Sequence, residues 1–242
     1  MAALICTGAA SSLVTLPRGA SATPTPLKLT RFPAAPPTPA SPPPDLPPPP
    51  PSFAPQYDPT GKLETPCNVE LVNSTRYQIR IYGTPSGQSF STAAVQAGNW
   101  SAATRAGFFL NFQYIEGANN HQTKIPMTAP VVTRTQDEKN WLVSFFTPQS
   151  IYASIAEAPV PSDPNVNLEV MPLSAFAVVE FGGEADEFDY KIASRLLKDA
   201  LVEDKVTLAP ATDPWAEAWC GYDAPNDIFN RHNEAWVKIV LS

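Results

Sequence analysis

Phe108, Phe112 and Ile115 form an apolar stripe on a helix that we predict over residues 100–116, and Arg105 flanks this stripe. A helix turns 100° per residue, so a second set of residues lies together on another side of it: Trp100, Ala103, Gly107, Leu110 and Tyr114. This second set is sufficient to dock the helix on a sheet. Because a surface helix ordinarily has one apolar stripe, something must cover the stripe that contains Phe108. A flat apolar ligand with an acidic group near Arg105 would do so. The alternative is a covering loop, such as residues 151–164.

Other candidate chemistry is sparse. The chain has two histidines, His121 and His232. We place His121 in the loop after the first helix, where it either reaches a ligand or is solvated. No CxxC, HExxH, GxxxxGK[ST] or GxSxG motif is present, and no metal site with zinc spacing is predicted. Cys220, between Trp219 and Gly221, has the context of a buried small residue. These residues do not predict an enzyme.

Charge and hydropathy exclude two classes of partner. The chain up to Lys62 carries four basic and two acidic residues, and the remainder has a net charge of −9. Such an acidic domain is poorly suited to nucleic acid, whose affinity comes mainly from phosphate neutralisation. No apolar run reaches the roughly 18 residues that a spanning helix needs, so we expect no transmembrane segment.

Residues 1–32 have the composition of a targeting leader. No acidic residue precedes Asp45, and Ala, Ser, Thr and Pro dominate around Arg18, Lys28 and Arg31. This composition is typical of a transit peptide and predicts a plastid (chloroplast) location. A secretory signal, with an apolar segment from Ala2 to Leu16, and a retained tail are the alternatives.

Residues 33–62 are predicted to be a Pro-rich, disordered linker. Thirteen of the 23 residues from Pro33 to Pro55 are proline. Proline lacks the backbone N–H of helix and sheet and favours extended polyproline II. The segment is a spacer or, alternatively, a ligand for a Pro-rich-peptide-binding domain.

The remainder, residues 63–242, reads as two related halves. The first half has predicted strands at 77–82, 88–95, 124–134 and 140–147, with the helix at 100–116 after Asn99 as its cap. The second half has predicted strands at 176–181, 215–222 and 234–241, and a helix at 185–202. This repeat predicts a pseudo-twofold α+β domain with two helices against one curved antiparallel sheet or barrel.

Four segments together resemble the SOUL/haem-binding protein family: residues 77–82, 107–117, 124–131, and the C-terminal run 221–225 with 230–236. The resemblance implies a tandem-duplicated, distorted antiparallel β-barrel flanked by two helices. It also implies binding of haem b or a related tetrapyrrole, without a settled catalytic reaction. The family's apolar patch, with a basic residue near the haem propionates, falls here on Arg105, Phe108 and Phe112, beside Ile115 and His121.

Two positions depart from the family's pattern. Ile81 stands where one subgroup carries a histidine axial ligand, and Asp227 stands at a position where a basic residue is proposed near the propionates. We therefore expect weak or water-mediated iron ligation, or ligation by His121. The expected function is non-enzymatic haem or porphyrin sequestration or carriage. The alternative is a protein-interaction module that uses the Pro-rich arm or the exposed helix face. Whether Cys67 pairs with Cys220 is open at this stage.

Overall fold

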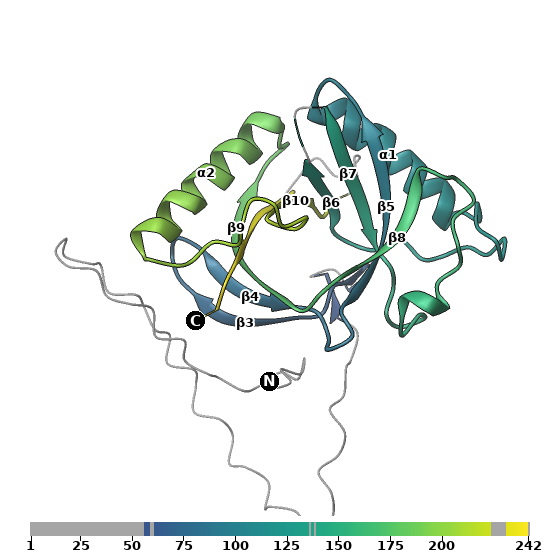
Figure 1. Cartoon of the computed structure of the whole chain (residues 1–242), viewed down its shortest axis with the longest axis horizontal. Helices are drawn as coiled ribbons and strands as arrows, with labels where there is room; N and C mark the ends of the chain where they lie inside the picture. Colours follow the sequence, from purple (N-terminus) through teal and green to yellow (C-terminus); the bar gives the residue numbers. More distant parts are fainter. Residues whose placement is uncertain (1–55, 59–60, 136, 138, 224–230, 242) are drawn as a thin grey trace, which may run out of the picture.

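The computed structural model describes residues 56–58, 61–135, 137, 139–223 and 231–241. The predicted leader and residues 33–55 of the Pro-rich segment lie outside the described residues. Within this part of the chain, nine antiparallel strands form one sheet that curls into a half-barrel (Figure 1). A short two-stranded ribbon of β1 (Gln56–Tyr57) and β2 (Glu64–Thr65) precedes the sheet.

The sheet has the order β3-β4-β9-β11-β10-β6-β7-β5-β8. Its strands are β3 (Asn68–Asn73), β4 (Gln78–Tyr82), β5 (Gln88–Gln96), β6 (Val131–Thr135), β7 (Asn140–Phe146), β8 (Val166–Met171), β9 (Ser174–Gly182), β10 (Glu217–Gly221) and β11 (His232–Ile239). The β5–α1–β6–β7 segment and the β9–α2–β10–β11 segment have the same element order. Because β10 pairs with β6 at the middle of the sheet, with Cys220 opposite Val132, the two repeats meet there.

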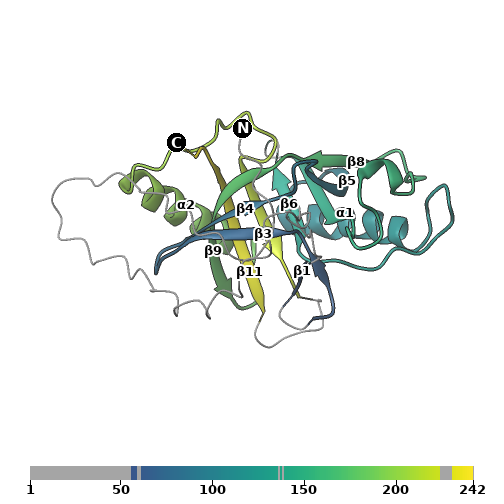
Figure 2. The same ribbon diagram turned by 90° about the horizontal axis from the view of Figure 1, so that it is seen from below.

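Each repeat contributes one helix with a polar N-terminal cap. The first helix, α1 (Trp100–Ile115), begins at Asn99, whose side chain accepts a hydrogen bond from the Ala102 N–H. The second helix, α2 (Glu187–Glu203), begins at Asp186 with a capping box. The two helices lie toward opposite ends of the molecule, with the strands between them (Figure 2). None of the described helices is long and apolar enough to cross a membrane.

The two faces of the sheet bury different side chains. One face carries an aromatic cluster that includes Tyr82, Phe176 and Trp236, together with Cys220. The other face packs under the helices: α2 buries Leu197 and Leu201 against strand residues of the second repeat. The fold class therefore agrees with the predicted α+β barrel flanked by two helices.

The structure corrects the predicted elements in two places. Residues 124–130 are not part of a strand, since β6 begins at Val131. Pro126 and Pro130 lack the N–H that a sheet ladder needs. The predicted docking stripe of the first helix is also partly wrong, because Asn111 and Ile115 are buried whereas Leu110 is only half-buried.

Candidate functional site

Three phenylalanines form an aromatic patch on the outer side of α1. Phe109 is 53% exposed and Phe112 is 39% exposed, while Phe108 is half-buried. The Phe108 and Phe112 rings are stacked with centroids 5.8 Å apart and planes 13° from parallel. The inner neighbour of Phe108 is Phe145 of β7, at 5.2 Å in an edge arrangement. The patch thus rests on the core and exposes apolar ring surface to solvent.

The opposite side of α1 explains why these rings face outward. Ala103 and Gly107 are buried, and a Cβ built on Gly107 would lie 2.5 Å from Val143 Cβ. Asn111 is also buried, and its amide donates hydrogen bonds to the carbonyl oxygens of Gly107 (3.0 Å) and Val143 (2.8 Å). Small residues and the two hydrogen bonds donated by the Asn111 amide therefore hold the helix close to β7, and the large aromatic residues are left on the outer side.

The five residues that the sequence points to have different environments. Arg105 is exposed and forms no ion pair with any residue that the structure describes. Phe108 and Phe112 belong to the patch. Ile115 is 5% exposed and lies in the core with Tyr114 and Phe145, so it has almost no surface for a ligand. His121 is exposed in the loop after α1, where its backbone N–H donates to Asn119 Oδ1 (3.2 Å).

The loop at residues 151–164 does not bury the patch. It is held at the C-terminal end of α1, where the Tyr114 hydroxyl donates to the Pro159 carbonyl (2.8 Å) and the Val160 N–H donates to Asn120 Oδ1 (2.7 Å). Lys124, which pairs with Glu116 at 2.5 Å, is exposed near the same end of the helix. Phe109 and Phe112 keep their exposure despite this loop.

Ile81, at the position of the family's histidine ligand, lies beneath the other helix. It is 7% exposed and packs in a cluster with Leu197 and Leu201 of α2. Asp227 lies outside the described residues. Ile81 therefore does not contribute to the aromatic patch.

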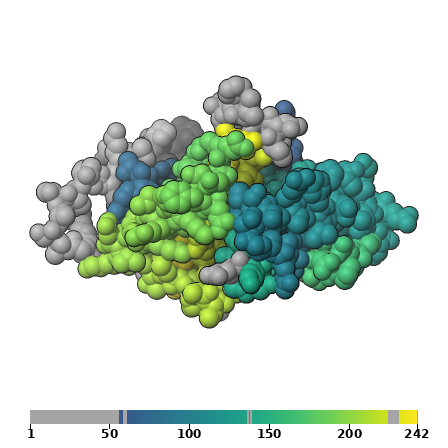
Figure 3. Space-filling view, turned by 90° about the horizontal axis from the view of Figure 1, so that it is seen from above, coloured from purple at the N-terminus to yellow at the C-terminus, as the bar shows by residue number. Residues whose placement is uncertain are grey.

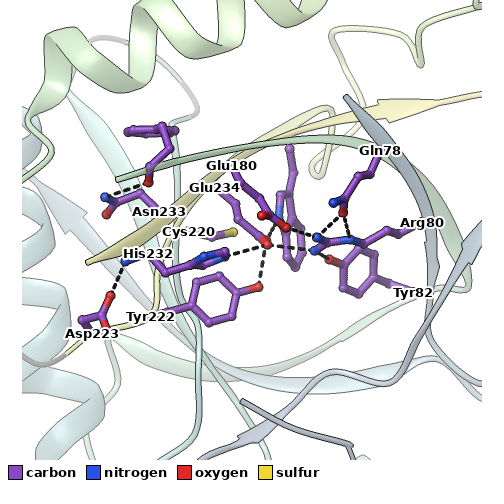
Figure 4. Close-up of polar contacts among 12 residues, drawn as sticks. Gln78, Arg80, Tyr82, Glu180, Cys220, Tyr222, Asp223, His232, Asn233 and Glu234 are labelled. Atoms are coloured by element: carbon purple, nitrogen blue, oxygen red, sulfur yellow. Dashed lines mark hydrogen bonds and ion pairs between the residues drawn. The ribbon is translucent and has the colours of Figure 1, made fainter. Parts of the chain in front are cut away.

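A second candidate cluster surrounds Glu234 on the other face of the sheet (Figure 4). Glu234 is 1% exposed. Its carboxylate accepts hydrogen bonds from Arg80 Nη1 (2.8 Å), Tyr222 Oη (2.8 Å) and Trp236 Nε1 (2.6 Å), and His232 Nε2 lies 2.9 Å away. Arg80 also pairs with Glu180 on the neighbouring strand. Strand pairing explains this grouping, because Glu234 of β11 is directly opposite Glu180 of β9.

The cluster sets the charge states of its members. Burial alone would raise the pKa of Glu234, but the hydrogen bond with His232 and the charge of Arg80 outweigh it and hold the pKa below its ordinary value. The hydrogen bond with Glu234 in turn raises the pKa of His232, against the effect of partial burial. This is an ion-paired network with a histidine at its accessible edge.

Glu180, His232 and Glu234 have ligand atoms within 4.8 Å of one another, as a metal site requires. Arg80, however, pairs with both carboxylates, so its guanidinium supplies the positive charge that a metal ion would bring. A cation there would be held beside a buried guanidinium. The chemistry of the donor set thus favours the ion pair over a metal.

The remaining sequence candidate, Cys220, is a buried free thiol and therefore does not pair with Cys67. Burial raises the pKa of the Cys220 thiol well above its ordinary value, which opposes nucleophilic chemistry.

Two features of the structure were not predicted from the sequence: the exposed Phe109 and the Glu234 cluster. Phe109 was missed because its exposure becomes clear only once the side of α1 that packs on the sheet is known. The Glu234 cluster was missed because it depends on pairing between strands that are distant in sequence.

The repeated strand–helix–strand–strand units and the aromatic patch define a two-repeat α+β barrel protein with an apolar surface on its first helix. The family model described as SOUL heme-binding protein matches residues 63–238. The chain belongs to this family. It is 28% identical over 155 residues to Heme-binding protein 1 of Xenopus tropicalis, covering 62% of this chain and 78% of the relative. It is also 28% identical over 172 residues to Heme-binding protein 2 of Homo sapiens, covering 66% of this chain and 77% of the relative.

Among solved structures, the C-terminal domain of EcmrR is similar at 16% sequence identity with a TM-score of 0.47. This comparison covers 69% of this chain and 99% of that domain.

Proposed function

We propose that this protein binds haem or a related tetrapyrrole on the aromatic patch of α1 (Phe108, Phe109 and Phe112). The observation that carries the proposal is the parallel stack of Phe108 and Phe112, of which Phe112 is 39% exposed. A macrocycle bound there would bury the exposed apolar surface of Phe109 and Phe112. Arg105, exposed and without an ion pair among the described residues, supplies a positive charge for a propionate.

The names of the relatives support this ligand class. Both vertebrate proteins are named as haem-binding proteins, and neither name describes a reaction. We therefore infer sequestration or carriage without catalysis. The composition of the leader motivates a plastid location. Fusion of residues 1–62 to a fluorescent protein tests this location, and secretion of the fusion would contradict it.

The patch accounts for moderate affinity. Burying about 200 Å² of porphyrin would contribute roughly 5 kcal/mol before the costs of association. By itself this apolar contact corresponds to a Kd of about 0.2 mM at best, so the pairing of a propionate with Arg105 must add to it for micromolar binding. His121 is exposed in the loop after α1, and within the described residues its ring makes no contact with the rings of the three phenylalanines. We therefore expect metal-free protoporphyrin IX to bind about as well as haemin.

The experiment is a spectrophotometric titration of the full chain with haemin and with protoporphyrin IX. Phe112→Asp places a charge on the patch, and Phe188→Asp makes the same change at a 68% exposed phenylalanine on α2. We expect one saturable equivalent for the wild type, at least about tenfold weaker binding for Phe112→Asp, and no change for Phe188→Asp. Equal affinity of both variants would contradict the proposed site.

Arg105 has its own test. Arg105→Gln removes the charge and keeps a polar side chain, so it is expected to weaken haemin binding about three- to tenfold. The dimethyl ester of haemin lacks the propionate charges, and its affinity should not change. A similar loss for both ligands would mean that Arg105 acts through packing.

A further inference from the structure

The aromatic patch of α1 is not covered by the described part of the chain. Phe109 and Phe112 remain 53% and 39% exposed there. The ring of Phe108 contacts both, with its centroid 6.0 Å from that of Phe109 and 5.8 Å from that of Phe112. Exposed apolar side chains that are contiguous, rather than scattered, commonly mark an interaction surface. Such a surface accepts a macromolecular segment as well as a small ligand.

Residues 33–55, which we call the Pro-rich arm, have a composition suited to this surface. They lie outside the described residues, and thirteen of the 23 are proline. Proline-rich sequences favour polyproline II, a conformation that is recognised by exposed aromatic side chains. Because this backbone is restricted before binding, little conformational entropy is lost when it docks.

The arm joins the described chain in the half of the molecule that contains α1. Gln56 is the first residue of β1, which pairs with β2. In β2, the carbonyl oxygen of Glu64 accepts a hydrogen bond from the Ala129 N–H at 3.0 Å. Met127, two residues before Ala129, packs in the same cluster as Phe108. Figure 2 shows β1 in the same half of the molecule as α1, with α2 toward the other end.

The arm is long enough to reach the patch. At about 3.1 Å per residue, its 23 residues span about 70 Å when extended. A globular domain of this size is about 40 Å across. Tethering also gives the arm an effective concentration on the order of 1 mM at the surface of its own domain. A contact with a millimolar dissociation constant would therefore occupy about half of the molecules.

The charges of the two partners are complementary. Asp45 is the one charged residue of the arm. Arg105 lies one helical turn before Phe109, is exposed, and forms no ion pair with any residue that the structure describes. An exposed pair of this kind contributes less than about 1 kcal/mol, so it orients the arm more than it holds it.

A second apolar surface, on α2, fits the arm less well. It consists of Phe188, Ile192 and Leu196, which are 68%, 42% and 63% exposed. This surface offers one aromatic ring, whereas the patch of α1 offers three. It also lies toward the end of the molecule opposite α1, away from β1 (Figure 2).

We infer that the Pro-rich arm docks on the aromatic patch of α1 and covers it until a tetrapyrrole displaces it. The contact itself does not depend on tetrapyrrole binding. The competition rests on the proposed function, so the two are tested separately.

The first test uses the full chain labelled with [¹⁵N]phenylalanine, in which each phenylalanine gives one amide signal. Single Phe→Leu variants assign the signals of Phe109, Phe112 and Phe188. An arm variant changes the five prolines at 47–51 to serine and keeps the length of the chain. Its control changes the three prolines of the leader, Pro17, Pro24 and Pro26, to serine.

We expect the Phe109 and Phe112 signals of the arm variant to differ from those of the wild type, and those of the control to match the wild type. The Phe188 signal should be the same in all three proteins, which also verifies that they are folded. Identical Phe109 and Phe112 signals in the arm variant and the wild type would overturn the inference. A change confined to Phe188 would place the arm on α2 and would overturn it as well. Signals that shifted with protein concentration would mean that the arm binds a second copy, which contradicts docking within one chain.

The second test is a titration of the same three proteins with protoporphyrin IX. Because the arm no longer competes, the arm variant should bind about three- to tenfold more tightly than the wild type and the control. Equal affinities would contradict the competition. If none of the proteins bound protoporphyrin IX while the amide signals differed as expected, the proposed function would fail and the docking of the arm would stand.

Discussion

The carboxylate of Glu187, at the start of α2, accepts a hydrogen bond from the backbone N–H of Trp100, the first residue of α1, at 3.1 Å. The first N–H groups of a helix have no partner within the helix, and the helix dipole favours a negative charge beside them. A residue of the second repeat thus helps to cap the helix of the first. The contact joins the two repeats, and Figure 3 shows the green surface of the α2 segment beside the teal surface of the α1 segment.

Replacing Glu187 should therefore loosen the start of α1. We expect Glu187→Ala to lower the free energy of unfolding by about 1 kcal/mol, as loss of a helix cap typically does. Glu187 also pairs with Lys191, so Lys191→Ala serves as the control that removes the ion pair and keeps the cap. Urea denaturation should show a smaller loss for Lys191→Ala, about 0.3–0.5 kcal/mol. Equal losses would mean that the cap contributes nothing.

Gly107 provides the second prediction, because α1 approaches β7 there. In an exposed helix, Gly→Ala would stabilise by roughly 1 kcal/mol. At Gly107 the new Cβ would lie 2.5 Å from both Cβ and Cγ2 of Val143, so the helix must shift. We expect Gly107→Ala to destabilise the protein by about 1–3 kcal/mol in urea denaturation.

Gly98→Ala is the matched control for this substitution. Nothing lies within 4 Å of a Cβ built at Gly98, and its φ is not in the left-handed region. Its effect on the free energy of unfolding should be within about 0.5 kcal/mol. A stabilised Gly107→Ala variant would show that the helix is not held against Val143.

The elements that were predictable from the sequence are those with strong periodicity and local caps. The helix after Asn99 is an example, because its cap and its apolar positions are adjacent in sequence. Strands β3 and β8 were missed: both lie at the ends of the sheet, and their burial does not alternate cleanly. An edge strand with one neighbour carries a weaker pattern than a central strand.

The site was predictable to the extent that it lies on one helix. Phe108, Phe112 and Arg105 could be grouped by helical spacing, whereas the buried position of Ile115 required the packing of the helix on its sheet. Arg80 and Glu234 are 154 positions apart, and only the strand order of β4, β9 and β11 brings them together. Long-range pairing of this kind leaves no local signal in one sequence.

Arg80 and Glu234 give the third prediction. Removing one partner of a buried ion pair leaves the other charge uncompensated, which typically costs about 3–5 kcal/mol. Arg80→Met keeps much of the apolar volume of the side chain and should destabilise the protein by about 3 kcal/mol in urea denaturation. The Arg80→Met/Glu234→Gln double variant should recover part of this loss, since the carboxylate charge is removed as well. If the free energy of unfolding of Arg80→Met were within about 0.5 kcal/mol of the wild-type value, the proposed role of this ion pair would be contradicted.

The last prediction concerns pH and His232. Its hydrogen bond with Glu234 raises the pKa above the ordinary value of 6.5 in the folded protein. Below the unfolded pKa both states are protonated, and the stabilisation is fully present. As pH rises, the unfolded chain loses its proton first, so the contribution declines until the folded pKa is passed. We therefore expect the stability difference between wild type and His232→Gln to be largest below about pH 6 and to fall toward pH 8.5.

The measurement is the free energy of unfolding of both proteins in urea at several pH values across that range. Glu234 stays ionised throughout, because its pKa lies below the ordinary value of 4.5. Its own titration therefore does not contribute to the difference between the two proteins. A difference that grew with rising pH would mean that His232 is held in its neutral form. The hydrogen bond with Glu234 would then have to be assigned to the neutral imidazole, which donates through Nε2 without carrying charge.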